Sequence, residues 1–281
     1  MLANPHQPSA EHTEAVDRCV QVLSSAPAGL ITDIDGTISV MAPTPGEAVV
    51  TEEARTALRR LAERLAFVGV VTGRSASVGE ALVGVPGLVY VGNHGTERRQ
   101  NGTSQIHPEA AASAAILGQA LRAVYERAHA LGVGDGLVLE DKGLSGSIHY
   151  RLTLRPEEAR TVLVELANEA AADAGLLVTE GRLVVELRPR LRVNKGTALV
   201  DLVHEHHLRG VVFLGDDLTD VDAFRAVREL REAGEIDGLR VGVLAPETQP
   251  EVLAETDVTV HGVHACVDVL QGIVGRLPPL R

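Results

Sequence analysis

Two stretches of the chain alternate short apolar, β-branched runs with longer helical segments. In the first stretch we expect strands at 29–32, 67–71 and 88–91, with helices at 51–65 and 75–83 between them. In the second, helices at 195–207 and 218–232 alternate with strands at 211–214, 239–243 and 258–260, and a last helix follows. Strands separated by helices pair in parallel, because the helix carries the chain back across the sheet. The alternation predicts the α/β class, with a parallel-sheet core built from two separate parts of the chain. A further helix, at 9–23, is expected to pack beside the first strand.

The segment between these stretches follows a different pattern. An Ala-rich helix at 108–131 precedes two strands, a helix and two more strands, at 137–140, 147–154, 156–174, 176–178 and 183–187. Turn residues at 143–146 and 180–181 favour hairpins, and so antiparallel pairing. We therefore expect a small α+β domain inserted into the core, with joints near 101–104 and 188–190. The chain divides accordingly into 1–104, the first part of the core, 105–188, the inserted domain, and 189–281, the second part of the core.

Composition narrows the possible partners. The 281 residues carry a net charge of −12 and include three Phe, three Tyr and no Trp. They offer neither a basic face for phosphate neutralisation nor rings for base stacking, so nucleic acid is not an expected partner. The apolar runs fall short of the roughly 18 residues that span a bilayer, and the first residues lack the pattern of a secretory leader. With only two Cys residues, we expect a reduced, cytoplasmic protein without membrane association.

Reactive side chains follow three of the predicted core strands. These strands run into Asp33-Ile34-Asp35-Gly36-Thr37, Thr72-Gly73-Arg74 and Gly215-Asp216-Asp217-Leu218-Thr219-Asp220. Ligands of open α/β sheets gather at the carboxyl ends of the strands, so we expect these groups to converge. Carboxylates crowded at one edge repel one another unless a cation lies among them. Because oxygen ligands of this kind suit Mg²⁺, the sequence predicts a magnesium site at this edge.

The same groups fit phosphoryl transfer. We expect Asp33 to be the nucleophile and Asp35 to be the acid/base that protonates the leaving alkoxide. Thr72 is expected to donate its hydroxyl to a phosphate oxygen. Lys195, at the start of the helix at 195–207, is expected to bring an ammonium to the nucleophile and the phosphate. In this hypothesis Asp216 completes the metal site, with Asp217 and Asp220 supporting it or capping the next helix.

In chain order, four motifs resemble those of the haloacid dehalogenase superfamily of aspartyl-phosphate phosphatases, which has a Rossmann-like core. They are Asp33 to Thr37, Thr72, Lys195 and Gly215 to Asp220. The inserted segment is similar to the α+β cap of that superfamily. Within it, the chain resembles the trehalose-6-phosphate phosphatase family from about residue 29 to the last helix. The residues that carry this resemblance are Gly92-Asn93-His94-Gly95-Thr96-Glu97-Arg98, Glu140-Asp141-Lys142, His149-Tyr150-Arg151, Val185-Glu186-Leu187-Arg188-Pro189 and Lys195-Gly196-Thr197-Ala198-Leu199.

The resemblance implies a Mg²⁺-dependent phosphatase that acts on a phosphorylated disaccharide. It implies that Mg²⁺ is held by Asp33, the backbone carbonyl of Asp35 and Asp216. It also implies that the cap reaches the distal sugar with Glu140, Lys142 and Glu186. From their place at or near the same edge we further expect substrate contacts from Arg74, Asn93, His94 and Arg98.

Plainer interpretations exist for several of these residues. Asp33 to Thr37 alone would fit a strand-ending turn, an interpretation that the three other motifs disfavour. Asp217 and Asp220 fit helix capping equally well, and the charged cap residues fit solvated faces of antiparallel strands. The histidines at 204, 206 and 207 do not share one helical face, so we interpret them as surface residues and not as metal ligands.

Our first hypothesis is the hydrolysis of trehalose 6-phosphate to trehalose and phosphate, through an aspartyl-phosphate on Asp33, by a monomer or small homo-oligomer. One alternative keeps the chemistry but changes the substrate to sucrose 6-phosphate or a glycosyl-phosphoglycerate. A phosphosugar mutase is disfavoured by the cap pattern. A non-catalytic sugar-phosphate sensor or partner subunit of a synthase belongs to a different class, and it would have no need for an acid/base at Asp35.

Overall fold

The computed structural model describes residues 10–279. Residues 1–8, in which we found no leader pattern, and the first residue of the helix predicted at 9–23 lie outside the described residues. Within 10–279, no helix is both long enough and apolar enough to cross a membrane.

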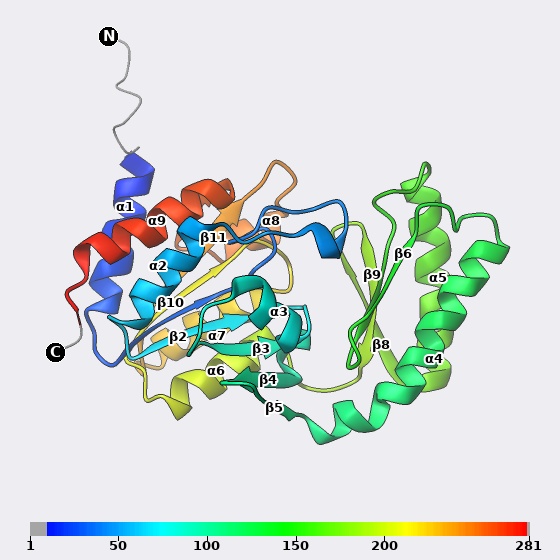
Figure 1. Cartoon of the computed structure of the whole chain (residues 1–281), viewed down its shortest axis with the longest axis horizontal. Helices are drawn as coiled ribbons and strands as arrows, with labels where there is room; N and C mark the ends of the chain where they lie inside the picture. The colour runs from blue at the N-terminus through cyan, green and yellow to red at the C-terminus, as the bar shows by residue number, and fades with distance from the viewer. Residues whose placement is uncertain (1–9, 280–281) are drawn as a thin grey trace, which may run out of the picture.

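A large sheet of eight strands forms the core (Figure 1). Its spatial order is β12 (Val258–His261), β11 (Asp237–Leu244), β10 (Gly210–Gly215), β1 (Ala28–Thr32), β2 (Phe67–Val71), β3 (Val89–Gly92), β4 (Glu97–Gln100) and β5 (Thr103–Ile106). The strands from β12 to β3 are parallel, and β4 and β5 are antiparallel to their neighbours. The chain proceeds from β1 towards β2 and β3, then returns to β10 on the other side of β1 and proceeds towards β12. The order thus reverses between β1 and β10, where Thr32 pairs with Leu214, and ligands of such sheets bind at this point.

Helices cover both faces of this sheet. One face carries α1 (Ala10–Leu23), α2 (Glu52–Ala62), α3 (Ala76–Val83) and α9 (Gly262–Arg276), and the other carries α6 (Lys195–Glu205), α7 (Val221–Glu232) and the short α8 (Pro250–Ala254). Neighbouring strand residues point to opposite faces, so the fully buried Leu30 and Ile31 belong to separate apolar clusters. The helix α1 contacts β1 but packs more extensively on α9 and β10.

A second, antiparallel sheet has the order β6 (Val138–Asp141), β7 (Gly146–His149), β9 (Val184–Pro189) and β8 (Leu176–Gly181). The helices α4 (Pro108–Ala130) and α5 (Pro156–Ala174) cover its outer face, and the opposite face is turned towards the core (Figure 1). We call β6–β9 with α4 and α5 the cap. The division of the chain into core, cap and core stays a prediction, and β5 and β9 each run across one of its expected boundaries, 104/105 and 188/189.

Two local predictions about this region are wrong. The strand expected at 147–154 ends at His149, and Leu154 lies 95% exposed. The joint expected near 101–104 is a hairpin that adds β5 to the large sheet. Its turn residues Asn101 and Gly102 have φ of 50° and 78°, and an Asn-Gly pair is the most favourable sequence for a two-residue hairpin turn. The strands β4 and β5 are short and polar, so no apolar run marks them in the sequence.

Candidate active site

Asp33 and Lys195 meet at the reversal point of the sheet. Asp33 follows β1, and its amide donates to Leu214 O on β10 at 2.9 Å. Lys195 is the first residue of α6, and its ammonium lies 3.2 Å from Asp33 Oδ2 and 2.8 Å from Asp220 Oδ1. Burial raises the pKa of the Asp33 carboxyl, and the ammonium opposes that shift. Asp33 Oδ1 is buried without a hydrogen-bond partner, which leaves one oxygen free for a ligand.

The loop after β10 supplies the other carboxylates. Asp216 Oδ1 accepts from the Thr37 hydroxyl at 2.9 Å. Asp220 Oδ2 accepts from the amides of Asp216 and Asp217 at 3.0 and 3.2 Å. Asp217 Oδ1 accepts from the amide and hydroxyl of Thr219 at 2.8 and 2.7 Å. Asp217 and Asp220 therefore shape the loop, and Asp216 is turned towards Asp33.

Three of these carboxylates lie close enough together to bind one metal ion. Asp33, Asp216 and Asp220 place one oxygen each within 4.8 Å of one another. Asp220, however, spends both oxygens on Lys195 and on backbone amides. Burial and the neighbouring carboxylates raise the pKa of Asp216 well above its usual range, the effect expected of acidic groups gathered without a cation. The donor set fits a hard divalent cation held by Asp33 and Asp216.

Gly36 permits the close approach of these groups. Its φ is 83°, and a Cβ placed there would lie 1.9 Å from Asp216 Oδ2. A side chain at this position would therefore displace the Asp216 carboxylate from Asp33.

We expect Gly36→Ala to reduce the phosphate release predicted from the sequence by at least about 100-fold, because a displaced Asp216 would disturb the predicted metal site. The positive φ alone costs about 1–2 kcal/mol. The matched control is Gly87→Ala: Gly87 has the same φ of 83° with nothing within 4 Å of the added Cβ. Phosphate release and urea unfolding of both variants check this. Similar activity in the two would show that strain, and not the Asp216 contact, sets the effect.

The Asp35 carboxylate binds Arg74 and is not part of the group formed by the oxygens of Asp33, Asp216 and Asp220. The Arg74 guanidinium binds it in a bidentate ion pair, with Nε–Oδ2 at 2.5 Å and Nη2–Oδ1 at 2.7 Å. This places Asp35 beside the cavity, where an acid/base is needed, and leaves its backbone carbonyl as the predicted metal ligand. Thr72 is buried in the cavity wall. Its Oγ1 accepts from the Arg74 amide at 3.2 Å, so its hydroxyl proton is available to a phosphate oxygen.

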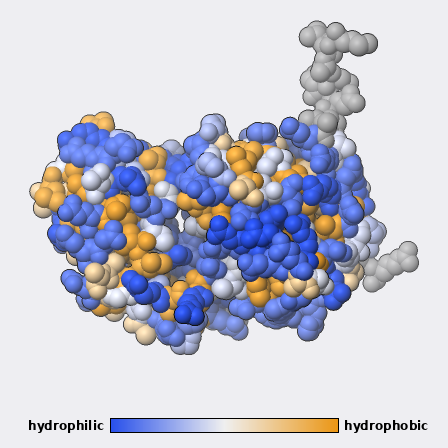
Figure 2. Space-filling view, turned by 180° about the vertical axis from the view of Figure 1, so that it is seen from behind, coloured by the Kyte–Doolittle hydropathy of each residue, from blue (hydrophilic) through white to orange (hydrophobic). Residues whose placement is uncertain are grey.

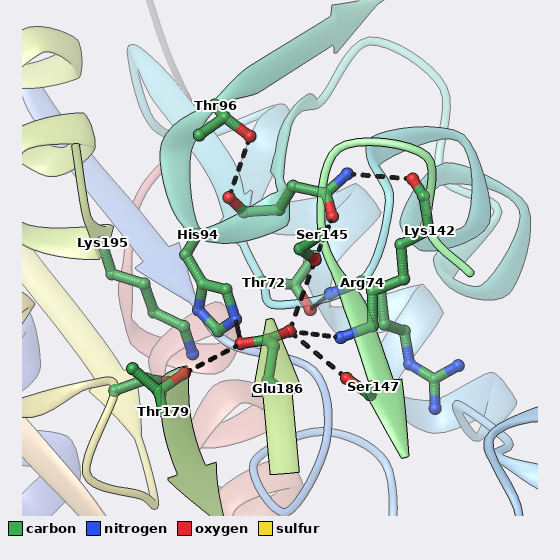
Figure 3. A network of polar contacts seen from close by, with 12 residues as sticks. Thr72, Arg74, His94, Thr96, Lys142, Ser145, Ser147, Thr179, Glu186 and Lys195 are labelled. Carbon is green, nitrogen blue, oxygen red and sulfur yellow. Dashed lines mark hydrogen bonds and ion pairs between the residues drawn. The ribbon is translucent and has the colours of Figure 1, made fainter. Parts of the chain in front are cut away.

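The cap closes the other side of the cavity around Glu186. As Figure 3 shows, His94 Nε2 and the Lys142 ammonium reach its two oxygens, at 2.9 and 2.7 Å. The His94 ring and the Lys142 ammonium hold the pKa of Glu186 well below its usual range despite burial. Hydroxyls at 3.3–3.5 Å complete the set, from Ser145, Ser147 and Thr179. His94 belongs to the core, so this network joins the core to the cap.

Asn93 adds a second connection between core and cap. Its Oδ1 accepts from the Ser145 hydroxyl at 2.6 Å, and its Nδ2 donates to Glu97 at 2.6 Å. Asn93 and His94 have positive φ, 47° and 56°. Such strained non-glycine backbone persists only where the surroundings enforce it. Here the positive φ values occur where the side chains of Asn93 and His94 both contact the cap.

Most of the predicted site residues line one cavity of about 170 Å³ between core and cap, whereas Asn93, Arg98 and Asp220 are not among its lining residues. Figure 2, seen from behind, shows the surface hollowed between these two parts. Glu140 lines the cavity and pairs with His149 Nε2 at 2.9 Å. Arg98 is not brought to the site: its guanidinium contacts Glu205 and His206 at the end of α6. We expected a substrate contact because Arg98 lies near the active edge of the sheet in the sequence pattern, but the strand β4 directs it away.

Sequence reasoning missed Ser145, Ser147 and Thr179, since single hydroxyls in predicted turns and on or beside predicted strands carry no motif. It also left one useful indication unused. The chain contains only two lysines, Lys142 and Lys195, among 26 basic residues, and both line the cavity. Arginine serves the other basic positions, so the two lysines mark places where a compact ammonium is required.

A parallel sheet with its carboxylates and lysine at the reversal point, closed by an antiparallel cap, defines the haloacid dehalogenase-like class of α/β proteins. The profile of the family described as "Trehalose-phosphatase" matches residues 31–251, and the chain belongs to this family. The trehalose-phosphate phosphatase of Mycobacterium avium is 38% identical over 203 residues, which cover 70% of this chain and 50% of that protein. The predicted family and fold class are thus confirmed.

Solved structures share the whole fold. The C-terminal domain of Candida albicans trehalose-6-phosphate phosphatase matches with a TM-score of 0.76 at 18% identity, covering 97% of this chain and 99% of that one. The C-terminal domain of the Candida albicans trehalose synthase regulatory protein matches with 0.64 at 14% identity, covering 94% and 98%. At these identities the likeness shows the fold alone. The chain spans about half the length of the Mycobacterium avium relative.

Proposed function

We propose that this protein hydrolyses trehalose 6-phosphate to trehalose and phosphate, with Mg²⁺, through an aspartyl-phosphate on Asp33. The observation that carries the proposal is that one cavity has two chemically different ends. Asp33, Lys195 and Asp216 form the phosphate end, and the Glu186 network of the cap forms a polar end suited to sugar hydroxyls. Relatives named trehalose-phosphate phosphatases support the substrate.

In the first half of the reaction, a carboxylate oxygen of Asp33 forms a bond to phosphorus while the bond to the sugar oxygen breaks. Asp35 gives its proton to that oxygen, so the sugar leaves as an alcohol. Thr72 donates a hydrogen bond to a phosphate oxygen, and Lys195 places its positive charge beside the new Asp33–phosphorus bond. Mg²⁺, when bound by Asp33, Asp216 and the Asp35 carbonyl, supplies further positive charge to the phosphate oxygens.

In the second half, a water molecule forms a bond to phosphorus and passes a proton to the Asp35 carboxylate. The bond between Asp33 and phosphorus then breaks, and the electron pair returns to the Asp33 carboxylate. Asp35 thus alternates between acid and base. The cap, closed over the cavity, keeps other water away from the acyl phosphate.

The cap network explains how a site without Trp would recognise a disaccharide. Glu186 is buried and Lys142 is partly buried, and the partners of both side chains in this network are polar. A substrate that displaces one of these contacts without supplying a matching hydroxyl leaves a polar group unpaired, and discrimination of this kind reaches about 10⁴-fold, beyond what an apolar pocket achieves.

The deciding experiment measures phosphate release from a panel of sugar phosphates. We expect a strong preference for trehalose 6-phosphate over glucose 6-phosphate, sucrose 6-phosphate and a glycosyl-phosphoglycerate. Equal activity on glucose 6-phosphate would replace the proposal with a general sugar phosphatase. No release from any of them, with Mg²⁺ present, would favour the sensor or partner-subunit hypothesis.

Metal removal provides a separate prediction. EDTA should abolish phosphate release, and Mg²⁺ in excess should restore it. Because a ligand that binds only the folded state stabilises it, Mg²⁺ should also raise the melting temperature of the wild type. Asp216→Asn should lose most of this stabilisation. Equal stabilisation of both proteins by Mg²⁺ would place the metal elsewhere.

A further inference from the structure

The loop at 40–49, which follows the catalytic Asp33–Thr37 motif, forms one wall of the cavity. Its base is closed by the antiparallel bridge between Ser39 and Val50, and its flanking Val40 and Val49 are 53% and 63% exposed. Five residues of this loop, 41–45, line the cavity. We call 41–45 the wall segment.

Two arginines from different parts of the molecule bind the wall segment. Arg151, in the cap, donates from Nη1 to Ala42 O at 3.1 Å and from Nη2 to Arg182 O at 3.2 Å. Arg74, in the core, donates from Nη1 to Pro45 O at 2.9 Å while its other nitrogens hold the Asp35 carboxylate. The wall segment therefore lies between a cap arginine and the arginine that orients the acid/base.

The wall segment is stiff enough to connect these two contacts. Pro43 and Pro45 fix their own φ and restrict Ala42 and Thr44, the residues before them, to extended conformations. Thr44 has φ −126° and ψ 154°, as this predicts. A displacement of Ala42 is therefore passed on to Pro45, because few torsions between them can absorb it.

We infer that Arg151 is a positioning residue that couples cap closure to the acid/base: it fixes the wall segment, which holds Arg74 on Asp35. The inference rests on the proposed function, and it assigns Arg151 a role separate from sugar binding. Asp35 would be well placed only with the cap closed, so proton transfer is confined to the state that excludes bulk water.

The test uses p-nitrophenyl phosphate, a substrate without sugar. Its leaving nitrophenolate accepts the electron pair of the breaking phosphorus–oxygen bond without needing a proton, so formation of the Asp33 phosphate does not require Asp35 as acid. Hydrolysis of that phosphate still requires Asp35 as base for the attacking water. In Arg151→Ala we expect kcat/KM for this substrate within about twofold of wild type. We expect kcat to fall about tenfold, part of the roughly 10²- to 10⁴-fold effect of a positioned base. Nitrophenolate should then appear as a burst of one equivalent per active site.

Several outcomes would overturn the inference. Unchanged kcat on p-nitrophenyl phosphate, with a loss on trehalose 6-phosphate alone, would make Arg151 a sugar contact. An equal fall in kcat and kcat/KM would indicate general damage to the site. Arg151→Lys should recover part of kcat if the Ala42 contact is what counts. Arg151→Ala should add little to the loss in Arg74→Ala, because both act through one connection, and additive losses would contradict that.

The matched control is Arg127→Ala, which removes a cap arginine that pairs with Glu169 at 2.8 Å with both side chains 52% exposed. Arg127→Ala should have the kcat of the wild type and, like the wild type, should show no burst of nitrophenolate. Circular dichroism of each variant verifies folding. A wild type that releases no phosphate from trehalose 6-phosphate would contradict the proposed function. An active wild type with kinetically identical Arg151→Ala would contradict only the role of Arg151.

Discussion

Asp33→Asn should lower phosphate release from trehalose 6-phosphate by at least about 10⁴-fold, since the amide cannot form the acyl phosphate. The variant should remain folded. Burial already disfavours the charged form of Asp33, so a neutral side chain of the same shape does not add to the desolvation cost. Lys195 keeps Asp220 as its partner at 2.8 Å. We expect the free energy of unfolding to change by no more than about 1 kcal/mol.

The assay measures phosphate in the presence of Mg²⁺, with urea unfolding in parallel. Asp173→Asn is the control, because Asp173 is exposed on α5 of the cap, and it should match wild type in both measurements. An Asp33→Asn protein with near wild-type turnover would refute the aspartyl-phosphate mechanism.

The sequence predicted that Asp33, Thr72 and Asp216 lie together, because their convergence depends on local rules. Asp33, Thr72 and Asp216 each come directly after a buried strand, and parallel strands bring their carboxyl ends to one edge. The pairing of Thr32 with Leu214 then places Asp33 beside Asp216. To predict that these residues converge, it was enough to predict a parallel sheet.

The contacts of the other residues depend on tertiary geometry that no spacing reveals. Asp35 and Arg74 are separated by 39 positions, yet they form a bidentate pair. His94 meets Glu186 only because the cap folds back over the core. Arg98 shares a motif with both Asn93 and His94, but it lies on β4, whose direction takes it to Glu205. The motif that contains a residue predicted the region in which its side chain lies, but not the residue that it contacts.

The second large effect concerns Lys195→Met. The Lys195 ammonium is 2% exposed and lies between Asp33 and Asp220, which both have raised pKa values from burial. Without it, those carboxylates either remain charged and unpaired or take up protons. We expect a loss of about 3–5 kcal/mol in the free energy of unfolding at pH 7 in EDTA. Removing the positive charge beside the phosphate should also lower kcat by about 10²- to 10³-fold.

The pH dependence of this loss follows from its cause. A carboxyl whose pKa is raised by folding binds more protons in the folded state, so it destabilises most at neutral pH and less as the pH falls. The stability difference between Lys195→Met and wild type should therefore shrink as the pH is lowered from 7. Adding Asp220→Asn to Lys195→Met should recover part of the stability, because it removes one unpaired charge, without recovering kcat.

The other lysine provides the comparison that separates charge loss from loss of a buried side chain. Lys142→Met also removes an ammonium from the cavity, but Glu186 keeps His94 at 2.9 Å and its hydroxyl donors. Its stability loss should therefore be smaller than that of Lys195→Met, and the two should differ most at neutral pH. Equal losses with no pH dependence would show that packing, and not the charge between Asp33 and Asp220, is what Lys195 contributes. The expected difference would instead establish that the acidic edge of the sheet is held together by one internal cation.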